Sequence, residues 1–150
     1  MDDQEHGASS TVQSRPQLIR VVIVEATQPM VDAIVERISR DPLMIIVGTS
    51  TNGLEAIDLY EAHTPDALVM YTHLDGLDAI SATEEIKRRH PSAKIVITTV
   101  HDDPVIVSRA FEAGVAAYMI LPITSEEFSN VLRAIVGPRP PIENPTSSAA

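Results

Sequence analysis

Short apolar runs alternate along the chain with segments whose apolar residues recur three and four positions apart. The five runs are too short for helices and too uniformly apolar for half-exposed strands, and they cover residues 19–24, 44–49, 67–71, 94–100 and 117–120. This pattern predicts five parallel strands that are buried on both faces.

Amphipathic segments typical of helices follow each run. Three of them cover about residues 29–39, 53–63 and 77–89. The fourth has an N-cap residue, Asp103, before a proline and a stop signal at Gly114, with Val107, Ala110 and Phe111 predicted to face inward. The fifth begins with a capping box at Thr124 and carries an apolar stripe at Phe128, Val131, Leu132 and Ile135.

Strands that alternate with helices imply right-handed crossovers and a parallel sheet covered by helices on both sides. Five such units in one domain predict a flavodoxin-like, doubly wound α/β fold, (βα)5, with strand order 2-1-3-4-5. Chemistry in such a sheet lies beyond the carboxyl ends of the strands. The segments to inspect are therefore residues 25–27, 71–76, 98–102 and 121–122.

The amino-acid composition disfavours several classes of function. The 150 residues carry 21 acidic and 11 basic side chains, a formal net charge of −10, which disfavours nucleic-acid binding and favours a protein partner. Cysteine is absent and the five histidines are scattered, so neither sulfur-based zinc sites nor helical histidine pairs are expected.

The ends of the chain differ from its middle. Residues 1–18 and the proline-rich residues 137–150 contain little apolar material, so we expect both to be disordered around one domain at residues 19–136. No apolar run approaches the roughly 18 residues that span a membrane, and the acidic N-terminus is unlike a signal peptide. We expect a cytoplasmic protein without membrane association.

The predicted strand ends resemble the receiver domain of bacterial two-component response regulators. The resemblance covers nearly all of residues 19–136 and rests on several separate segments in matching order: residues 19–25, 64–70, 76–78, 94–103 and 112–118. It implies a domain that accepts a phosphoryl group from a histidine kinase on one aspartate. In that family Mg²⁺ is held by the aspartate and an acidic pair, while a threonine and a lysine contact the phosphoryl oxygens.

Carried over residue by residue, most of that chemistry is missing. The acidic pair falls on Glu25 and Ala26, the acceptor aspartate on Tyr71 and the lysine on Leu121, whereas Thr99 is retained. Mg²⁺ prefers several oxygen ligands including carboxylates, and a phenol cannot form an acyl phosphate. We therefore expect no metal and no cofactor.

More local expectations follow for this degenerate pocket. Tyr71 is predicted to fill it as an aromatic plug, and Glu25 to lie near the surface, hydrogen-bonded to Tyr71 or Thr99. Asp75 and Asp78 are expected to be turn residues rather than substitute acceptors. The resemblance also implies a cis bond between Leu121 and Pro122, where many receivers have a cis Lys-Pro pair.

The resemblance also points to an interaction surface. Tyr118 matches the family's switch aromatic, on a face formed by the fourth helix, fifth strand and fifth helix. The candidate contact residues on this surface are Ser108, Arg109, Glu112, Tyr118 and Arg133.

The leading hypothesis is a pseudo-receiver, an atypical response regulator that acts by phosphorylation-independent contact with a kinase, another regulator or itself, so a homodimer is possible. No helix-turn-helix output segment is visible, so direct DNA binding is not expected. The alternative is a receiver-like sensor with a small ligand in the altered pocket; the loop around His73 faintly resembles a cobalamin-binding loop. An enzyme built on Thr98, Thr99 and His101 is not favoured, because no acid is placed to orient the histidine.

Overall fold

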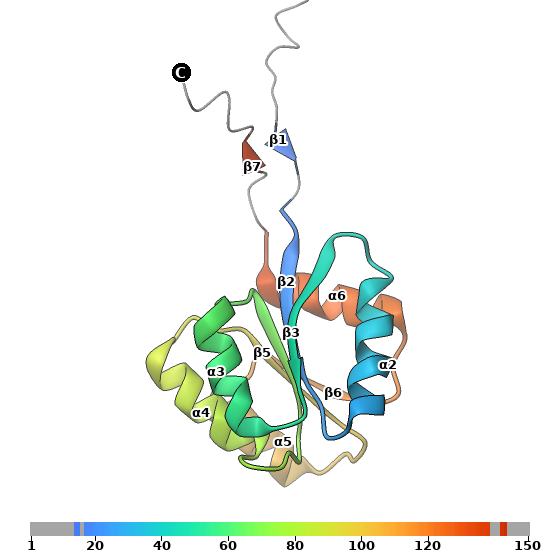
Figure 1. Ribbon diagram of the computed structural model, residues 1–150. Coiled ribbons are helices and arrows are strands. Elements are labelled where there is room, and N and C mark those ends of the chain that lie inside the picture. Colours follow the sequence, from blue (N-terminus) through green and yellow to red (C-terminus); the bar gives the residue numbers. More distant parts are fainter. Residues whose placement is uncertain (1–13, 16, 139–141, 144–150) are drawn as a thin grey trace, which may run out of the picture.

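A five-stranded parallel sheet forms the centre of the molecule (Figure 1). The computed structural model describes residues 14–15, 17–138 and 142–143. In sequence the strands are β2 (Ile19–Val24), β3 (Met44–Ser50), β4 (Ala67–Tyr71), β5 (Ile95–Thr99) and β6 (Ala117–Ile120). Their spatial order is β3-β2-β4-β5-β6, with every neighbouring pair parallel. This confirms the predicted order 2-1-3-4-5.

In the described part of the chain, five helices cover the two faces of the sheet (Figure 1). They are α2 (Gln28–Ser39), α3 (Gly53–His63), α4 (Ala79–Arg89), α5 (Pro104–Ala113) and α6 (Ser125–Val136). The predicted caps at Asp103, Gly114 and Thr124 are confirmed, the last as a complete capping box. Helix α4 begins two residues later than predicted because Asp78 acts as its N-cap. None of the described helices is long and apolar enough to cross a membrane.

Alternation along the strands divides the interior into two cores. Val21, Ile23 and Val69 face α2 and α6, where they pack with Ile34, Ile38, Phe128 and Leu132. The intervening residues Val22, Leu68 and Ile97 face α3, α4 and α5. Because successive strand residues point to opposite faces, a residue's position in its strand decides which helices cover it.

One predicted core residue of α5 lies outside. Ala110 is buried and Val107 half-buried as expected, but the Phe111 side chain is 49% exposed. The prediction for Phe111 is therefore wrong. Ala110 already occupies the contact with the sheet, and the residue that follows it points about 100° away around the helix.

The segments flanking the sheet form a second, minimal ladder. Strand β1 (Ser14–Arg15) pairs antiparallel with β7 (Ile142–Glu143), and Ser14 lies opposite Glu143. Most of the terminal ranges 1–18 and 137–150, for which disorder was expected, lies outside the described residues, so that expectation stays a prediction there. The ladder itself was not anticipated, because pairing of extended backbones needs no apolar side chains and leaves no mark in composition.

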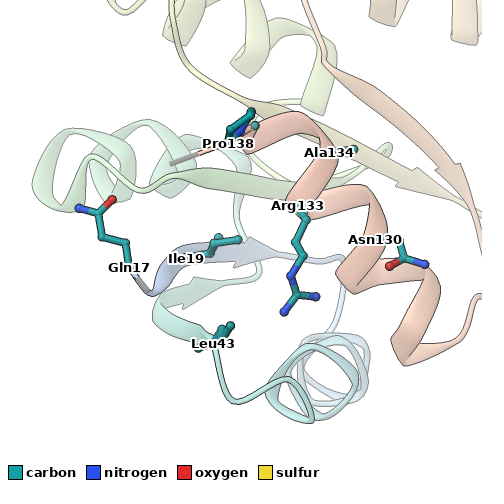
Figure 2. A pocket seen from close by; sticks show the side chains of 8 residues that line it. Gln17, Ile19, Leu43, Asn130, Arg133, Ala134 and Pro138 are labelled. Carbon is teal, nitrogen blue, oxygen red and sulfur yellow. The ribbon is translucent and has the colours of Figure 1, made fainter. Parts of the chain in front are cut away.

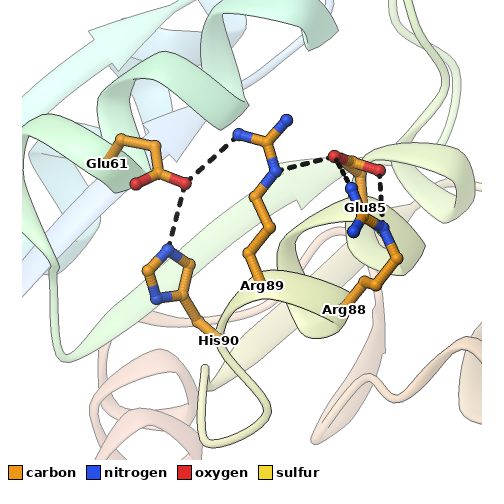
Figure 3. Close-up of polar contacts among 5 residues, drawn as sticks. All are labelled: Glu61, Glu85, Arg88, Arg89 and His90. Atoms are coloured by element: carbon orange, nitrogen blue, oxygen red, sulfur yellow. Dashed lines mark hydrogen bonds and ion pairs between the residues drawn. The ribbon is translucent and has the colours of Figure 1, made fainter.

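Charged side chains connect the ends of α3 and α4 (Figure 3). The Glu61 carboxylate lies 3.0 Å from the His90 ring and 3.3 Å from the Arg89 guanidinium, which also contacts Glu85 at 2.7 Å. Hydrogen bonds from His90 and then Arg89 lower the pKa of Glu61. Exposed ion pairs of this kind contribute little stability.

The loop that follows β4 is packed tightly against the start of α3. The Gly53 N–H donates to the carbonyl of Asp75 at 2.8 Å. A Cβ atom on Gly53 would lie 1.7 Å from the Leu77 carbonyl oxygen, which leaves no space for any side chain. This contact fixes the loop directly after Tyr71.

Replacing Gly53 with alanine tests that contact. We expect Gly53→Ala to destabilise the fold by roughly 2 to 3 kcal/mol, although alanine is the better helix former, because backbone must move to admit the methyl group. Chemical denaturation measures the change. Gly48→Ala is the control, since its Cβ would meet side chains rather than backbone, the end of Leu59 at 3.1 Å and the His63 ring at 3.5 Å, and it should cost less than about 1 kcal/mol. Equal stabilities of the two variants would contradict this packing.

Candidate functional site

The residues singled out from sequence gather at one edge of the sheet. Glu25 and Ala26 follow β2, Tyr71 ends β4, Thr99 ends β5 and Leu121 follows β6. Since these strands are parallel, their carboxyl ends lie at the same edge. Backbone pairing continues past the strands there, as the Leu121 N–H donates to the Thr99 carbonyl at 2.7 Å.

Glu25 is the most unusual residue at this edge, because its carboxyl group is completely buried. The Thr98 hydroxyl donates to Oε2 at 3.1 Å, whereas Oε1 has no hydrogen-bond partner among the described residues. Burial raises the pKa of Glu25 from 4.5 to about 8, and the hydrogen bond from Thr98 opposes that rise only in part. The carboxyl is therefore mostly protonated at neutral pH.

The predicted position and hydrogen-bond partners of Glu25 were wrong. It neither lies near the surface nor has a hydrogen bond to Tyr71 or Thr99. Position in the strand explains the difference: two residues beyond Ile23, Glu25 is on the face covered by α2 and α6. Thr98, two residues beyond Val96, is on that same face. Counting alternate positions in both strands places Thr98 on the same face as Glu25 and Thr99 on the other, although it does not establish the contact.

The other pocket residues are apolar or weakly polar. Tyr71 is half-buried and belongs to neither core cluster, so it does not fill the pocket completely as the predicted plug would. Leu121 is half-buried and packs against the core under α2 and α6, and Ala26 is half-buried. Thr99 is buried, and its hydroxyl accepts a hydrogen bond from the His101 backbone N–H at 3.2 Å. The Leu121-Pro122 bond is cis, as predicted.

The acidic residues in the loop after β4, Asp75 and Asp78, are a loop residue and a helix cap. Asp78 caps α4, accepting hydrogen bonds at 2.9 Å from both the backbone N–H and the hydroxyl of Ser81. Burial acts to raise the pKa of Asp78, but the hydrogen bonds from Ser81 outweigh it and lower that pKa. Asp75 and His73 are exposed in the loop, as predicted.

This edge does not suit Mg²⁺. The family's site needs a cluster of carboxylates, whereas here Glu25 is buried and mostly neutral, Ala26 is apolar and Tyr71 carries a phenol. Within the described ranges no three acidic or histidine side chains are arranged to hold a metal ion. The residues present therefore do not fit the metal, and no step is assigned to it.

The candidate surface residues separate into two places. Ser108, Arg109 and Glu112 are exposed on α5, and Tyr118 is half-buried on the edge strand β6, packed against the core under α5. Arg133 lies elsewhere.

Arg133 projects from α6 towards the loop before β3, at the opposite edge of the sheet from β6. Its guanidinium contacts the Asp41 carboxylate at 2.6 Å, beside a hollow that is also lined by Ile19 and Leu43 (Figure 2). Arg133 is on the predicted fifth helix, α6, but its side chain lies on the side of that helix near Asp41 and does not join the α5 and β6 residues in one surface. The apolar stripe of α6 predicts which side is buried but not which neighbour the polar side contacts.

Replacing Glu25 with glutamine tests the buried carboxyl. Its raised pKa means that stability from the neutral acid is complete below pH 4.5 and is lost progressively as the pH rises towards 8. Glu25→Gln should match the natural chain near pH 4.5 and be more stable by roughly 2 to 4 kcal/mol at pH 9, measured by denaturation. Glu36→Gln, at an exposed ion pair, should change stability by less than about 0.5 kcal/mol. A pH-independent difference for Glu25→Gln would contradict this assignment.

Comparisons with known proteins agree with the fold and the strand-end geometry. Residues 21–133 match the family model described as response regulator receiver domain. The transcriptional regulatory protein DesR of Bacillus subtilis is 30% identical over 119 residues, which cover 79% of this chain and 59% of DesR. A protein-glutamate methylesterase/protein-glutamine glutaminase of Anaeromyxobacter dehalogenans is 32% identical over 106 residues, covering 70% of this chain and 31% of the enzyme.

Solved structures give the same result. The receiver domain of the putative response regulator NarL from Mycobacterium tuberculosis superposes with a TM-score of 0.77 at 24% identity, covering 82% of this chain and 100% of that domain. A LuxR-family two-component response regulator from an Aurantimonas species gives 0.76 at 29% identity, with 80% and 86% covered. The chain spans about half the length of the curated regulators it matches, 50% to 59% for the first three. The chain belongs to the response regulator receiver domain family.

Proposed function

We propose that this receiver domain acts in two-component signalling without being phosphorylated, through contact with a kinase, another regulator or a second copy of itself. One observation supports the proposal: the residues at the strand-end edge are Tyr71, Thr99 and Leu121, none of which has a carboxyl group, and the carboxyl group of Glu25 is buried beneath α2. We infer that Tyr71 replaces the acceptor aspartate. The net charge of −10 supports a protein partner rather than a nucleic acid.

The chemistry of these groups supports phosphorylation independence. Forming an acyl phosphate needs an accessible carboxylate, and the phenol of Tyr71 cannot supply one. Glu25 has no exposed surface from which to attack a phosphoryl donor. Leu121 supplies no cation to balance the charge of a phosphoryl group. The differences from the family's acceptor aspartate and lysine at this edge are therefore mutually consistent.

We further infer that the chain is not an enzyme. The hydroxyl groups of Thr98 and Thr99 are engaged within the sheet edge, Thr98 with Glu25 and Thr99 with a backbone N–H. The His101 ring is exposed, and no ion pair joins it to an acid of the described residues. An activated nucleophile needs a base oriented by a third group.

Exposed apolar side chains support a contact surface around α5 and β6. Seven large apolar residues are exposed among the described residues, and four of them are in this region: Val100, Val105, Phe111 and Ile120. The backbone of β6 pairs only with β5 within the described sheet, so its outer edge is open. Apolar residues next to charged ones such as Arg109 and Glu112 are typical of protein interfaces. We call these four residues, with Tyr118, the contact face.

If the chain is not phosphorylated, its mass should stay the same after treatment with a phosphoryl donor. Incubation of the chain with acetyl phosphate and Mg²⁺, or with a histidine kinase, ATP and Mg²⁺, should add no phosphate detectable by intact mass spectrometry. The exposed Asp75 is the alternative acceptor to examine. A base-labile phosphate mapped to Asp75 or Asp78 would overturn the proposal.

A gain-of-function variant provides the control for that assay. The triple change Ala26→Asp, Tyr71→Asp and Leu121→Lys supplies an acidic residue, an acceptor and a cation around Thr99. It should bind Mg²⁺ and take up phosphate slowly from acetyl phosphate, because metal charge and proximity supply most of what this reaction needs. A folded triple variant that binds Mg²⁺ but takes up no phosphate would contradict the placement of these residues around one pocket.

The contact face predicts a surface-specific binding defect. Val105→Ser combined with Phe111→Ser should weaken self-association in sedimentation equilibrium, or binding to a purified kinase or regulator, by about tenfold or more. Both residues are more than 40% exposed, so the fold should be unaffected. Leu54→Ser is the matched control, an exposed apolar residue on α3 that should leave binding unchanged. Equal effects of the two variants would contradict the contact face.

A further inference from the structure

A polar hollow of about 260 Å³ lies where β4 and β5 begin, at the opposite end of these strands from the candidate site. Its walls come from α3, the turn before β4, the turn before β5 and the last residue of α6. The residues that line it are Tyr60, Pro65, Asp66, Ser92, Lys94 and Val136. The receiver family's phosphoryl chemistry takes place at the carboxyl ends of the strands and so does not account for this hollow.

Backbone hydrogen bonds fix the two charged residues of the hollow beside one another. The Asp66 N–H donates to the Arg20 carbonyl at 2.8 Å, and the Leu68 N–H donates to the Lys94 carbonyl at 2.9 Å. Asp66 directly precedes β4 and Lys94 directly precedes β5, and these two strands are paired. The hollow therefore brings together side chains from the starts of two neighbouring strands.

Tyr60 supplies a nearly enclosed hydroxyl group next to these charges. The residue is only 7% exposed, and its hydroxyl has no hydrogen-bond partner among the described residues. The hydroxyl is not one of the fully enclosed polar atoms, so it can be reached from the hollow that Tyr60 lines. A tyrosine phenol keeps its proton at neutral pH and can donate a hydrogen bond.

The turn that carries Ser92 packs against the same tyrosine. The His90 ring centroid lies 5.0 Å from that of Tyr60, and the His90 carbonyl accepts the Ala93 N–H at 2.9 Å, which closes the turn. Ser92 is exposed within this turn and lines the hollow. A second hydroxyl group is therefore positioned on the side of the hollow that Tyr60 contacts.

The hollow contains one charge of each sign. The Lys94 ammonium is exposed and forms no ion pair or hydrogen bond within the described part of the chain. The Asp66 carboxylate accepts the Arg20 N–H at 2.8 Å through Oδ2. A carboxylate has about four acceptor positions, so it can accept a further N–H in addition to its bonds within the chain.

We propose that this hollow binds a small zwitterionic α-amino acid, with its ammonium group against the Asp66 carboxylate and its carboxylate group against the Lys94 ammonium. The hydroxyls of Tyr60 and Ser92 donate hydrogen bonds to the same ligand carboxylate. Hydrogen bonds between charged groups are short and strong. The volume equals that of roughly nine water molecules, which limits the ligand to about nine non-hydrogen atoms.

The two opposite charges favour a zwitterion over ligands with a single charge. A simple carboxylate or phosphate would meet Lys94 but would lie beside the negative charge of Asp66. A simple amine would meet Asp66 but would lie beside the positive charge of Lys94. An uncharged molecule would form neither of the two ion pairs. Only a ligand with both charges is attracted by both side chains.

A ligand can enter without movement of a helix or strand. Ser92 and Lys94 are exposed at the rim, and the Lys94 ammonium is carried on a flexible four-carbon stem. The ammonium can therefore adjust to a ligand carboxylate that is one carbon away from the ligand's own ammonium. This proposal is independent of phosphorylation and of the contact face.

A ligand series tests the requirement for both charges. L-alanine, N-acetyl-L-alanine, which lacks the ammonium, and L-alaninamide, which lacks the carboxylate, are titrated into the isotope-labelled full chain at pH 7. Backbone amide shifts recorded by NMR should saturate with alanine around Tyr60, Asp66, Ser92 and Lys94. The affinity for alanine should be about tenfold above that for either analogue. Equal binding of either analogue, or no saturable shift with alanine, would overturn the proposal.

Variants test the polar groups one by one. Lys94→Gln and Asp66→Asn should each weaken alanine binding by about tenfold, and the asparagine oxygen can still accept the Arg20 N–H. Tyr60→Phe removes only the hydroxyl and should weaken binding by about threefold or more.

Arg109→Gln is the matched control, because this arginine is exposed on α5 and does not line the hollow. It should leave alanine binding unchanged. A loss equal to that of Lys94→Gln would indicate nonspecific ionic attraction and overturn the site. Unchanged binding by Lys94→Gln, an exposed position where the fold should be unaffected, would overturn it as well.

Discussion

The parallel sheet has helices on both of its faces, and the rest of the structure depends on this constraint. Each strand residue must be compatible with one of two buried layers, under α2 and α6 or under α3, α4 and α5. Only beyond the carboxyl ends of the strands does the chain leave these layers and become free to carry polar groups. The candidate site lies at those ends, and the contact face lies along the edge strand β6 and the neighbouring α5.

Glu25 shows that burial within a layer extends to the residue that follows a strand. Its position after Ile23 places the carboxyl under α2, where Thr98 provides a single hydrogen bond and desolvation keeps the acid neutral. In a site built for phosphoryl transfer, carboxylates must be ionised and accessible to a metal. A neutral, enclosed acid does not meet that requirement.

The sequence by itself determined the features that depend on local periodicity and local hydrogen bonding. These include the five strands and their order, the caps at Asp103, Gly114 and Thr124, and the gathering of Tyr71, Thr99 and Leu121 at one edge. The strands and caps follow from residues within a few positions of one another, and the gathering at one edge follows from the rule that parallel strands share an edge. The strand order follows from the usual arrangement of five alternating strand–helix units in one domain. The resemblance to receivers added the cis bond before Pro122.

Only the tertiary structure decided which distant groups meet. Thr98 bonds to Glu25 across 73 positions, and Arg133 pairs with Asp41 instead of joining α5. Gly53 packs against the Leu77 carbonyl, and Phe111 lies exposed. Amphipathic patterns encode which side of an element is buried, but not its rotation, offset and neighbours. These depend on how all the elements pack together, because a contact between distant residues requires the correct placement of both elements at once.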